Sequence, residues 1–298
     1  YDSLIEAGVV IDAYRTEENA ADVNDIITAL GLESVNIYGI SYGSRLALTV
    51  MKDPHPAIRS VILEGVYPPD VLSYVEDPIN IVRVFQAIGD GCADDPACNA
   101  QFPDLETVFI EAMDNLNEDP IIIEDPEEGQ IEITGDDFIG ELFASLYDTD
   151  AIPYAPALIY AAYNHDAEAI YDLLYAEESD EGFGSGQRWR GDNFENDGNS
   201  EGMFNSLDCA DEVPFNTLDG VEDAISELDL PSAWAEAFLG DAIDTMSVCD
   251  IWQVTPSDPS VREATYSDLP TLILNGDYDP VTPPNWGELA AEKISNRD

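Results

Sequence analysis

Gly39, Ser41 and Gly43 have the spacing Gly-x-Ser-x-Gly. The motif begins at the end of a largely apolar stretch, 34–40, and a helix-forming stretch follows it. In such a strand–turn–helix element the serine lies on a sharp, strained turn, with its hydroxyl exposed as a nucleophile. Side chains at the two glycine positions are expected to collide with the neighbouring strand or helix. The backbone N–H of Tyr42 would then point at a developing oxyanion. The alternative is a tight turn without chemistry.

Asp279 is the candidate acid to accompany this serine. A triad in this arrangement follows the chain order serine, acid, histidine, with the acid on a loop after a late strand. The stretch 269–276 has the apolar pattern of a strand, and Asp279 follows it, in a turn fixed by Pro280. Asp277 is the nearby competitor. Both acids could instead be solvated loop residues in an acid-rich chain.

Histidine is scarce, and both histidines precede the candidate acid. His55 lies between prolines after the elbow helix, at the edge expected to be far from Ser41. His165 lies at a helix boundary, where a capping or exposed role is favoured. The general base is therefore expected some tens of residues after Asp279, and the second oxyanion donor upstream of the chain. On this interpretation the 298 residues are a fragment with little or no activity.

The segments around the elbow predict a parallel sheet. The expected elements are helix 16–30, strand 34–40, helix 44–51 and strand 58–65. Strand, helix, strand is a βαβ unit, which requires parallel, mostly buried strands. From 72 to 255 the pattern is largely helical, with a hairpin at 121–134 and a cap at Thr134 for the following helix. The prediction is an α/β-hydrolase fold with an incomplete sheet, divided into core residues 1–71 and 256–298 and a helical cap at 72–255.

The charge balance excludes whole classes of partner. The chain has 63 Asp and Glu residues against 10 Lys and Arg residues, for a formal net charge of −53. Such a surface repels nucleic acids and anionic membranes, and no apolar run is long enough to span a bilayer. Screening in concentrated salt would relieve the repulsion, which favours a salt-rich habitat. The alternative is an acidic extracytoplasmic protein without salt adaptation.

The cysteines and acids do not form a metal-binding pattern. The four cysteines, Cys92, Cys98, Cys209 and Cys249, include no Cys-x-x-Cys pair, so we expect disulfides in an oxidising compartment, outside the cytoplasm. Four buried free thiols are the alternative. The acidic run 192–198 does not fit a calcium loop, because Phe204 replaces the required glutamate. No metal or other cofactor is predicted.

Several stretches together resemble the tripeptidyl and prolyl aminopeptidases of the α/β-hydrolase fold, especially the secreted bacterial tripeptidyl-aminopeptidase-like branch. The most specific are NIYGISYGSRLA at 36–47 and PTLILNGDYDPVTP at 270–283. The other matching stretches lie at 14–22, 58–69, 92–103, 208–211 and 249–252. The resemblance therefore extends over nearly the whole chain.

This resemblance implies a serine exopeptidase that acts on peptides with a free N-terminus, with Ser41 as nucleophile and Asp279 as acid. It also implies a Cys209–Cys249 disulfide within the cap. In such enzymes carboxylates bind the α-ammonium group of the substrate. The candidates here are Glu64, Asp208, Asp211 and Glu212. An esterase or lipase-like hydrolase and a non-catalytic binding protein on the same scaffold are the alternatives.

Overall fold

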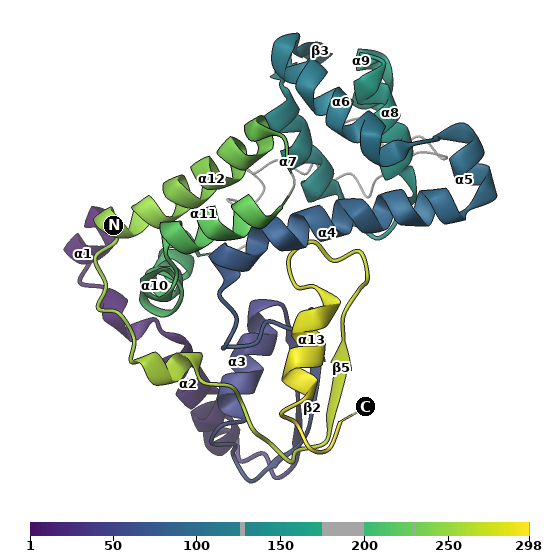
Figure 1. Cartoon of the computed structure of the whole chain (residues 1–298). Coiled ribbons are helices and arrows are strands. Elements are labelled where there is room, and N and C mark those ends of the chain that lie inside the picture. The colour runs from purple at the N-terminus through teal and green to yellow at the C-terminus, as the bar shows by residue number, and fades with distance from the viewer. Residues whose placement is uncertain (126–128, 175–199, 229, 298) are drawn as a thin grey trace. The chain divides into compact units, whose positions relative to one another are not determined.

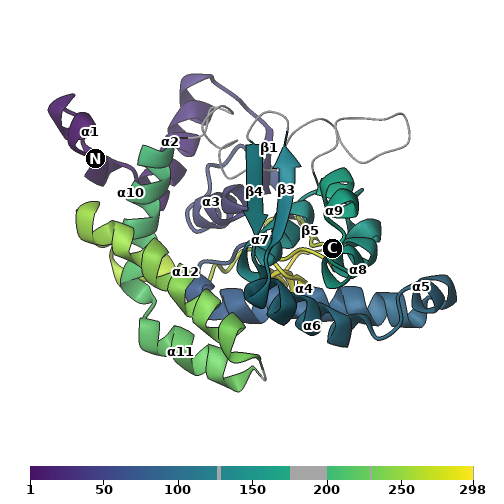
Figure 2. The same ribbon diagram turned by 90° about the horizontal axis from the view of Figure 1, so that it is seen from above.

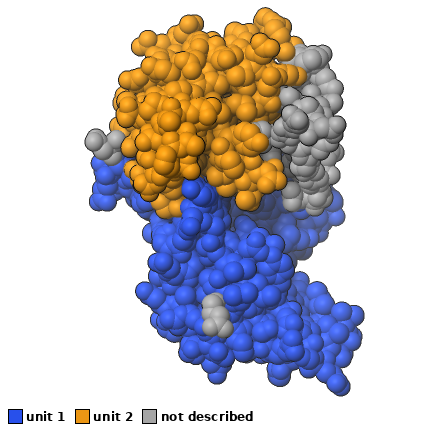
Figure 3. All heavy atoms as spheres, turned by 90° about the vertical axis from the view of Figure 1, so that its right-hand side faces the viewer, with its two compact units in different colours: residues 1–80, 200–228, 238–298 blue, residues 81–199, 229–237 orange. Residues whose placement is uncertain are grey.

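The computed structural model describes residues 1–125, 129–174, 200–228 and 230–297. They divide into two compact units, drawn in blue and orange in Figure 3. Unit 1 comprises Tyr1–Asn80, Ser200–Leu228 and Phe238–Asp298, and unit 2 comprises Ile81–Asn199 and Asp229–Ala237. The acidic run 192–198 lies outside the described residues.

Unit 1 contains the predicted strands and the elbow helix (Figure 1). Its elements are α1 (Asp2–Glu6), η1 (Ile11–Ala13), α2 (Thr16–Ala29), β1 (Val35–Ile40), α3 (Tyr42–Val50), β2 (Ile58–Glu64), α10 (Glu201–Asp211), η4 (Val213–Phe215), α11 (Leu218–Glu227), η5 (Pro259–Arg262), β5 (Thr271–Leu274) and α13 (Pro284–Ala291). Two long helices, α4 (Ser73–Asp94) and α12 (Ser232–Ile251), contribute residues to both units.

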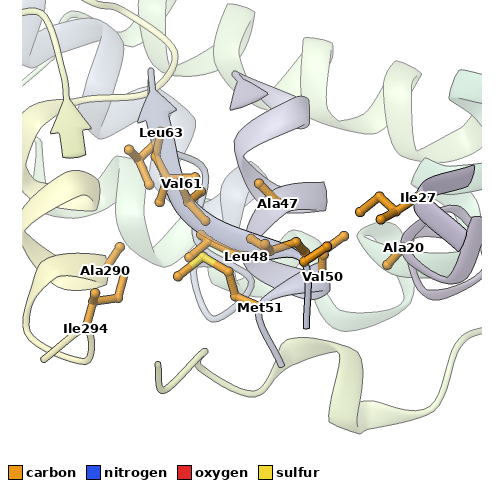
Figure 4. Packing of buried hydrophobic residues seen from close by; sticks show 13 residues of the cluster. Ala20, Ile27, Ala47, Leu48, Val50, Met51, Val61, Leu63, Ala290 and Ile294 are labelled. Atoms are coloured by element: carbon orange, nitrogen blue, oxygen red, sulfur yellow. The ribbon is translucent and has the colours of Figure 1, made fainter. Parts of the chain in front are cut away.

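Within the described residues, β1, β2 and β5 form a parallel sheet in the order β1-β2-β5. One face of this sheet carries the core of the unit. Val61 and Leu63 of β2 are buried there against Leu48 of α3 and Met51 directly after it, together with residues of α2 and α13 (Figure 4). The buried apolar area drives this packing, since each large side chain contributes about 1.5–3 kcal/mol when fully buried. The sheet thereby gains a rigid carboxyl edge, at which functional loops can be fixed.

The opposite face of the sheet is exposed and apolar. The register places Tyr38, Ile62 and Leu272 in one row, and Ile40, Glu64 and Leu274 in the next. Tyr38, Ile40, Leu272 and Leu274 are each at least 40% exposed. Parallel sheets are normally covered on both faces, so this surface departs from the usual pattern.

Unit 2 is mainly helical. Besides most of α4 it contains α5 (Pro96–Gln101), α6 (Leu105–Glu118), the antiparallel hairpin β3 (Ile121–Asp125) and β4 (Gly129–Ile133), α7 (Gly135–Ser145), η2 (Ile152–Tyr154), α8 (Ala155–Tyr163) and α9 (Ala167–Leu174), and Figure 2 shows the hairpin from above. The side chain of Thr134 caps α7 in a capping box with Asp137. A disulfide joins Cys92 to Cys98 across the turn between α4 and α5.

The two compact units do not test the predicted division into core and cap, which stays a prediction, but they group the helices differently. Residues 200–228 and 238–255 were expected in the helical cap, yet they group with the sheet. Direct bonds explain this. The backbone N–H of Thr16 donates to the Asp211 carboxylate at 2.9 Å, and Arg45 of α3 forms an ion pair with Glu212. The predicted Cys209–Cys249 disulfide is confirmed, and it joins α10 to α12 within unit 1. All four cysteines are paired, so the alternative of free thiols is wrong.

No helix in the described part of the chain is both long enough and apolar enough to cross a membrane.

The net charge of −53 predicts that salt stabilises the fold. Raising KCl from low to molar concentration shortens the screening length from about 10 Å at 0.1 M to about 3 Å at 1 M, which weakens repulsion between carboxylates. The midpoint of thermal unfolding, followed by circular dichroism, should therefore rise with KCl. Sucrose at equal osmolality is the control for solvent exclusion. A midpoint that does not change with KCl would contradict salt adaptation.

Candidate active site

Ser41 connects β1 to α3 with a strained backbone. Its φ is 52° and its ψ is −122°, a region that is essentially restricted to glycine. Gly39 allows the turn to close, because an added Cβ there would lie 2.2 Å from the carbonyl oxygen of Gly43. The expectation for Gly43 itself is wrong, since an added Cβ at that position has no atom within 4 Å. Ser41 is exposed.

Several bonds hold this turn in place. The Ser41 N–H donates to the carbonyl of Glu64 at 3.0 Å, which continues the β1–β2 pairing into the elbow. The Ser44 hydroxyl donates to the Ser41 carbonyl at 2.6 Å and accepts from the Tyr67 N–H at 2.8 Å. These contacts tie the first turn of α3 to the chain beyond β2.

Tyr42 begins α3, so its N–H belongs to the amides that point out of the helix N-terminus. The Tyr42 hydroxyl lies 3.1 Å from the Thr16 hydroxyl and accepts from the Asn19 side chain at 3.3 Å. Burial raises the pKa of this phenol. The side chain thus anchors the start of α3 to α2, while the main chain remains available for an oxyanion.

Asp279 lies beside the elbow. Its Oδ1 accepts from the N–H groups of Val281 and Thr282 at 2.9 and 2.8 Å, and its Oδ2 accepts from the Thr282 hydroxyl at 2.7 Å. A Cβ added to Gly65 would be 3.6 Å from Asp279 Oδ2 and 3.7 Å from the Ser41 nitrogen. Both groups therefore flank Gly65, which follows β2, and they lie at the carboxyl ends of β1 and β5, the strands on either side of β2. The competitor Asp277 is exposed.

The two histidines occupy other places. His55 precedes β2, and its Nδ1 accepts from the Ala57 N–H at 3.1 Å. Ser41 follows β1, so His55 and Ser41 lie at opposite ends of parallel strands. His165 belongs to unit 2, in the turn after α8, with a φ of 55°.

The proposed amine ligands have different surroundings. Asp211 is 2% exposed, and its carboxylate accepts from the Thr16 N–H at 2.9 Å and from the Ser257 hydroxyl at 2.5 Å. Glu212 is 6% exposed and bonds to Arg45 and Arg262. Both carboxylates are therefore engaged in holding unit 1 together.

Glu64 and Asp208 are the other two candidates. Glu64 belongs to the exposed face of the sheet, where it accepts from the Tyr38 hydroxyl. Asp208 of α10 is partly buried and accepts from the Tyr74 hydroxyl at 2.7 Å. Burial raises the pKa of Asp208 to about 6. The Asp208 carboxyl therefore gains or loses its charge near pH 6.

The sequence analysis missed two residues of this neighbourhood, Asp77 and Tyr74. Burial raises the pKa of Asp77 to about 7, and the negative charge of Asp241 adds to the effect. Tyr74 lies one helical turn before Asp77 on α4, and burial raises its pKa as well. Acids are so frequent in this chain that only the three-dimensional neighbours distinguish Asp77. The spacing of three residues, which places Tyr74 and Asp77 on one helix face, is the sole local hint.

Among the residues that the structure describes, no group of three or more His, Cys, Asp or Glu side chains could hold a metal ion.

Comparison with known proteins gives matches to two families and to curated relatives. Residues 3–107, which include Ser41, match the family described as alpha/beta hydrolase fold. Residues 236–297, which include Asp279, match the family described as TAP-like protein.

The relatives are proteins named Serine protease Hip1 from Mycobacterium bovis and from two strains of Mycobacterium tuberculosis. Each is 24% identical over 287 residues, covering 92% of this chain and 52% of the relative. The chain thus spans about half the length of the curated relatives it matches. Together with the parallel sheet and the strained serine, these matches show an α/β-hydrolase fold, and residues 236–297 are similar to TAP-like proteins.

Proposed function

We propose that the chain carries the nucleophile and the acid of a serine peptidase. The observation that supports this most directly is the strained backbone of Ser41, held next to Asp279 across Gly65. Strain of this kind persists where the surrounding structure over-determines it, and it accumulates at catalytic residues. The name of the mycobacterial relatives, serine protease, agrees with this chemistry.

The mechanism begins with attack by Ser41 Oγ on the carbonyl carbon of the scissile bond. A histidine takes the proton from Oγ, and Asp279 orients that imidazole and stabilises its charged form. The Tyr42 N–H donates to the oxyanion. The histidine then protonates the leaving amine, and water hydrolyses the acyl-enzyme. We assign the base to a histidine outside these 298 residues, because His55 lies at the wrong end of the sheet.

We further propose that the substrate is a peptide with a free N-terminus. Of the four sequence-derived candidates, Asp208 is the best amine ligand, because Asp211 and Glu212 are engaged by buried bonds. Glu64 lies on the exposed face of the sheet. The paired cysteines support a secreted or otherwise extracytoplasmic protein, since disulfides persist in oxidising compartments.

An esterase with the same elbow is the second candidate, since acyl transfer to serine serves both reactions. The rates of hydrolysis of tripeptidyl and aminoacyl amides, compared with those of short acyl esters, distinguish a peptidase from an esterase. Hydrolysis of esters alone would overturn the peptidase assignment. A binding protein without activity predicts no turnover of either class.

Replacing Ser41 by Ala should abolish labelling of the intact protein by a fluorophosphonate probe. Asp279→Asn should label more slowly, because loss of the triad acid typically lowers the rate by about 10⁴-fold. In-gel fluorescence measures the labelling. His55→Ala and His165→Ala are the controls, and both should label like the wild type. Persistent labelling of Ser41→Ala would rule out the nucleophile, and loss of labelling in a histidine variant would move the base into this chain.

The titration of Asp208 predicts a pH dependence specific to free N-termini. The carboxyl is charged above its pKa of about 6 and neutral below it, so the ion pair with the substrate amine weakens as the pH falls through 6. The ratio of kcat/KM for a free and an N-acetylated peptide amide should therefore fall below pH 6. Using the ratio cancels the titration of the catalytic histidine. Asp208→Asn should have a low, pH-independent ratio, and an unchanged ratio in that variant would contradict the assignment.

A further inference from the structure

Arg45 lies on α3, one helical turn after Ser41, and is 2% exposed. Its Nη2 is 2.5 Å from Oε1 of Glu212, and its guanidinium carbon lies 4.7 Å from the centre of the Tyr67 ring. A buried cation is destabilising unless it is paired. The burial of Arg45 on the elbow helix therefore indicates that its ion pair has a specific role.

Glu212 connects this cation to other parts of unit 1. Its carboxylate also bonds to Nη1 of Arg262 at 2.7 Å and accepts from the Ser73 hydroxyl at 3.1 Å. Arg45 uses only part of its bonding capacity, because its Nη1 has no hydrogen-bond partner within the described residues. The ion pair of Arg45 with Glu212 thus links α3 to the residue after α10, and the ring of Tyr67 reinforces it.

The location of this contact bears on the nucleophile. Residues four apart on a helix lie on one face, so Arg45 anchors the part of α3 directly behind Ser41. The strained backbone of Ser41 can persist only if its neighbours fix it. A displacement of about 1 Å in such a site can lower the rate about 10²-fold. Fixing α3 therefore fixes both the Ser41 hydroxyl and the Tyr42 N–H.

We propose that Arg45 is a positioning residue for Ser41 and that Glu212 is its anchor, not a substrate ligand. This inference rests on the proposed serine hydrolase function. On this proposal Arg45 and Glu212 affect the rate of acyl transfer, and other groups bind the substrate.

Arg45→Met and Arg262→Met are matched variants that test the proposal. Each removes one arginine from Glu212 and leaves the other to neutralise the carboxylate, but only Arg45→Met breaks the link to α3. The readouts are the limiting rate of fluorophosphonate labelling and the concentration at half-maximal rate, measured well below each unfolding midpoint. We expect Arg45→Met to lower the limiting rate about 10²-fold with the half-maximal concentration unchanged. Arg262→Met should keep the wild-type rate.

Arg45→Lys serves as the conservative variant. A lysine can restore a single charged contact to Glu212, so part of the labelling rate should return. Arg45→Lys also serves as the test if Arg45→Met does not fold. Its limiting labelling rate should then be below that of the wild type but above zero, and its half-maximal concentration should be unchanged.

Hydrogen–deuterium exchange gives a second readout that needs no activity. The α3 amides following Ser41 should exchange faster in Arg45→Met than in the wild type or in Arg262→Met. If the wild type fails to label, the proposed function fails and the exchange result alone decides the role of Arg45. Equal labelling and exchange in the wild type and Arg45→Met would overturn the proposal. If Arg45→Met and Arg262→Met lose the same labelling rate, the two arginines and Glu212 only stabilise the fold, and the proposal is also overturned.

Discussion

Ser41 keeps its strained backbone only because the sheet on one side and α3 on the other hold the turn. A residue with φ of 52° and ψ of −122° costs about 1–3 kcal/mol unless it is glycine, and that cost must be offset by packing and bonds around it. β1 and β2 fix the turn from one side, and the Ser44 hydroxyl and the buried Arg45 fix α3 from the other. Because β5 is the next strand, the same sheet edge also presents Asp279.

Burial divides the carboxylates of unit 1 into two roles. Asp211 and Glu212 are saturated by hydrogen bonds and arginines, and they attach α10 to the elbow region. Asp77 and Asp208 are partly buried, and this burial raises their pKa values to about 7 and about 6. The bonds of Asp211 and Glu212 suit an anchor, and Asp208 stays the proposed ligand of the substrate amine.

The sequence specifies the site where its signal is local. The apolar strand, the Gly-x-Ser-x-Gly turn and the following helix predict the elbow at Ser41, and the strand before Asp279 predicts where the acid lies. Other features depend on contacts between distant segments. The sequence predicts a largely helical pattern from 72 to 255, but it does not predict that Asp211 and Glu212 attach the segment 200–228 to the sheet unit. In a chain with 63 acids, the burial that distinguishes Asp77 is likewise tertiary information.

The most direct test of the account is to locate the covalent adduct by mass. The intact protein is treated with a fluorophosphonate, digested, and the modified residue is identified by tandem mass spectrometry. We expect the added mass on Ser41, in the peptide that joins β1 to α3. Modification of Ser44 or of a serine elsewhere, with Ser41 unmodified, would contradict it.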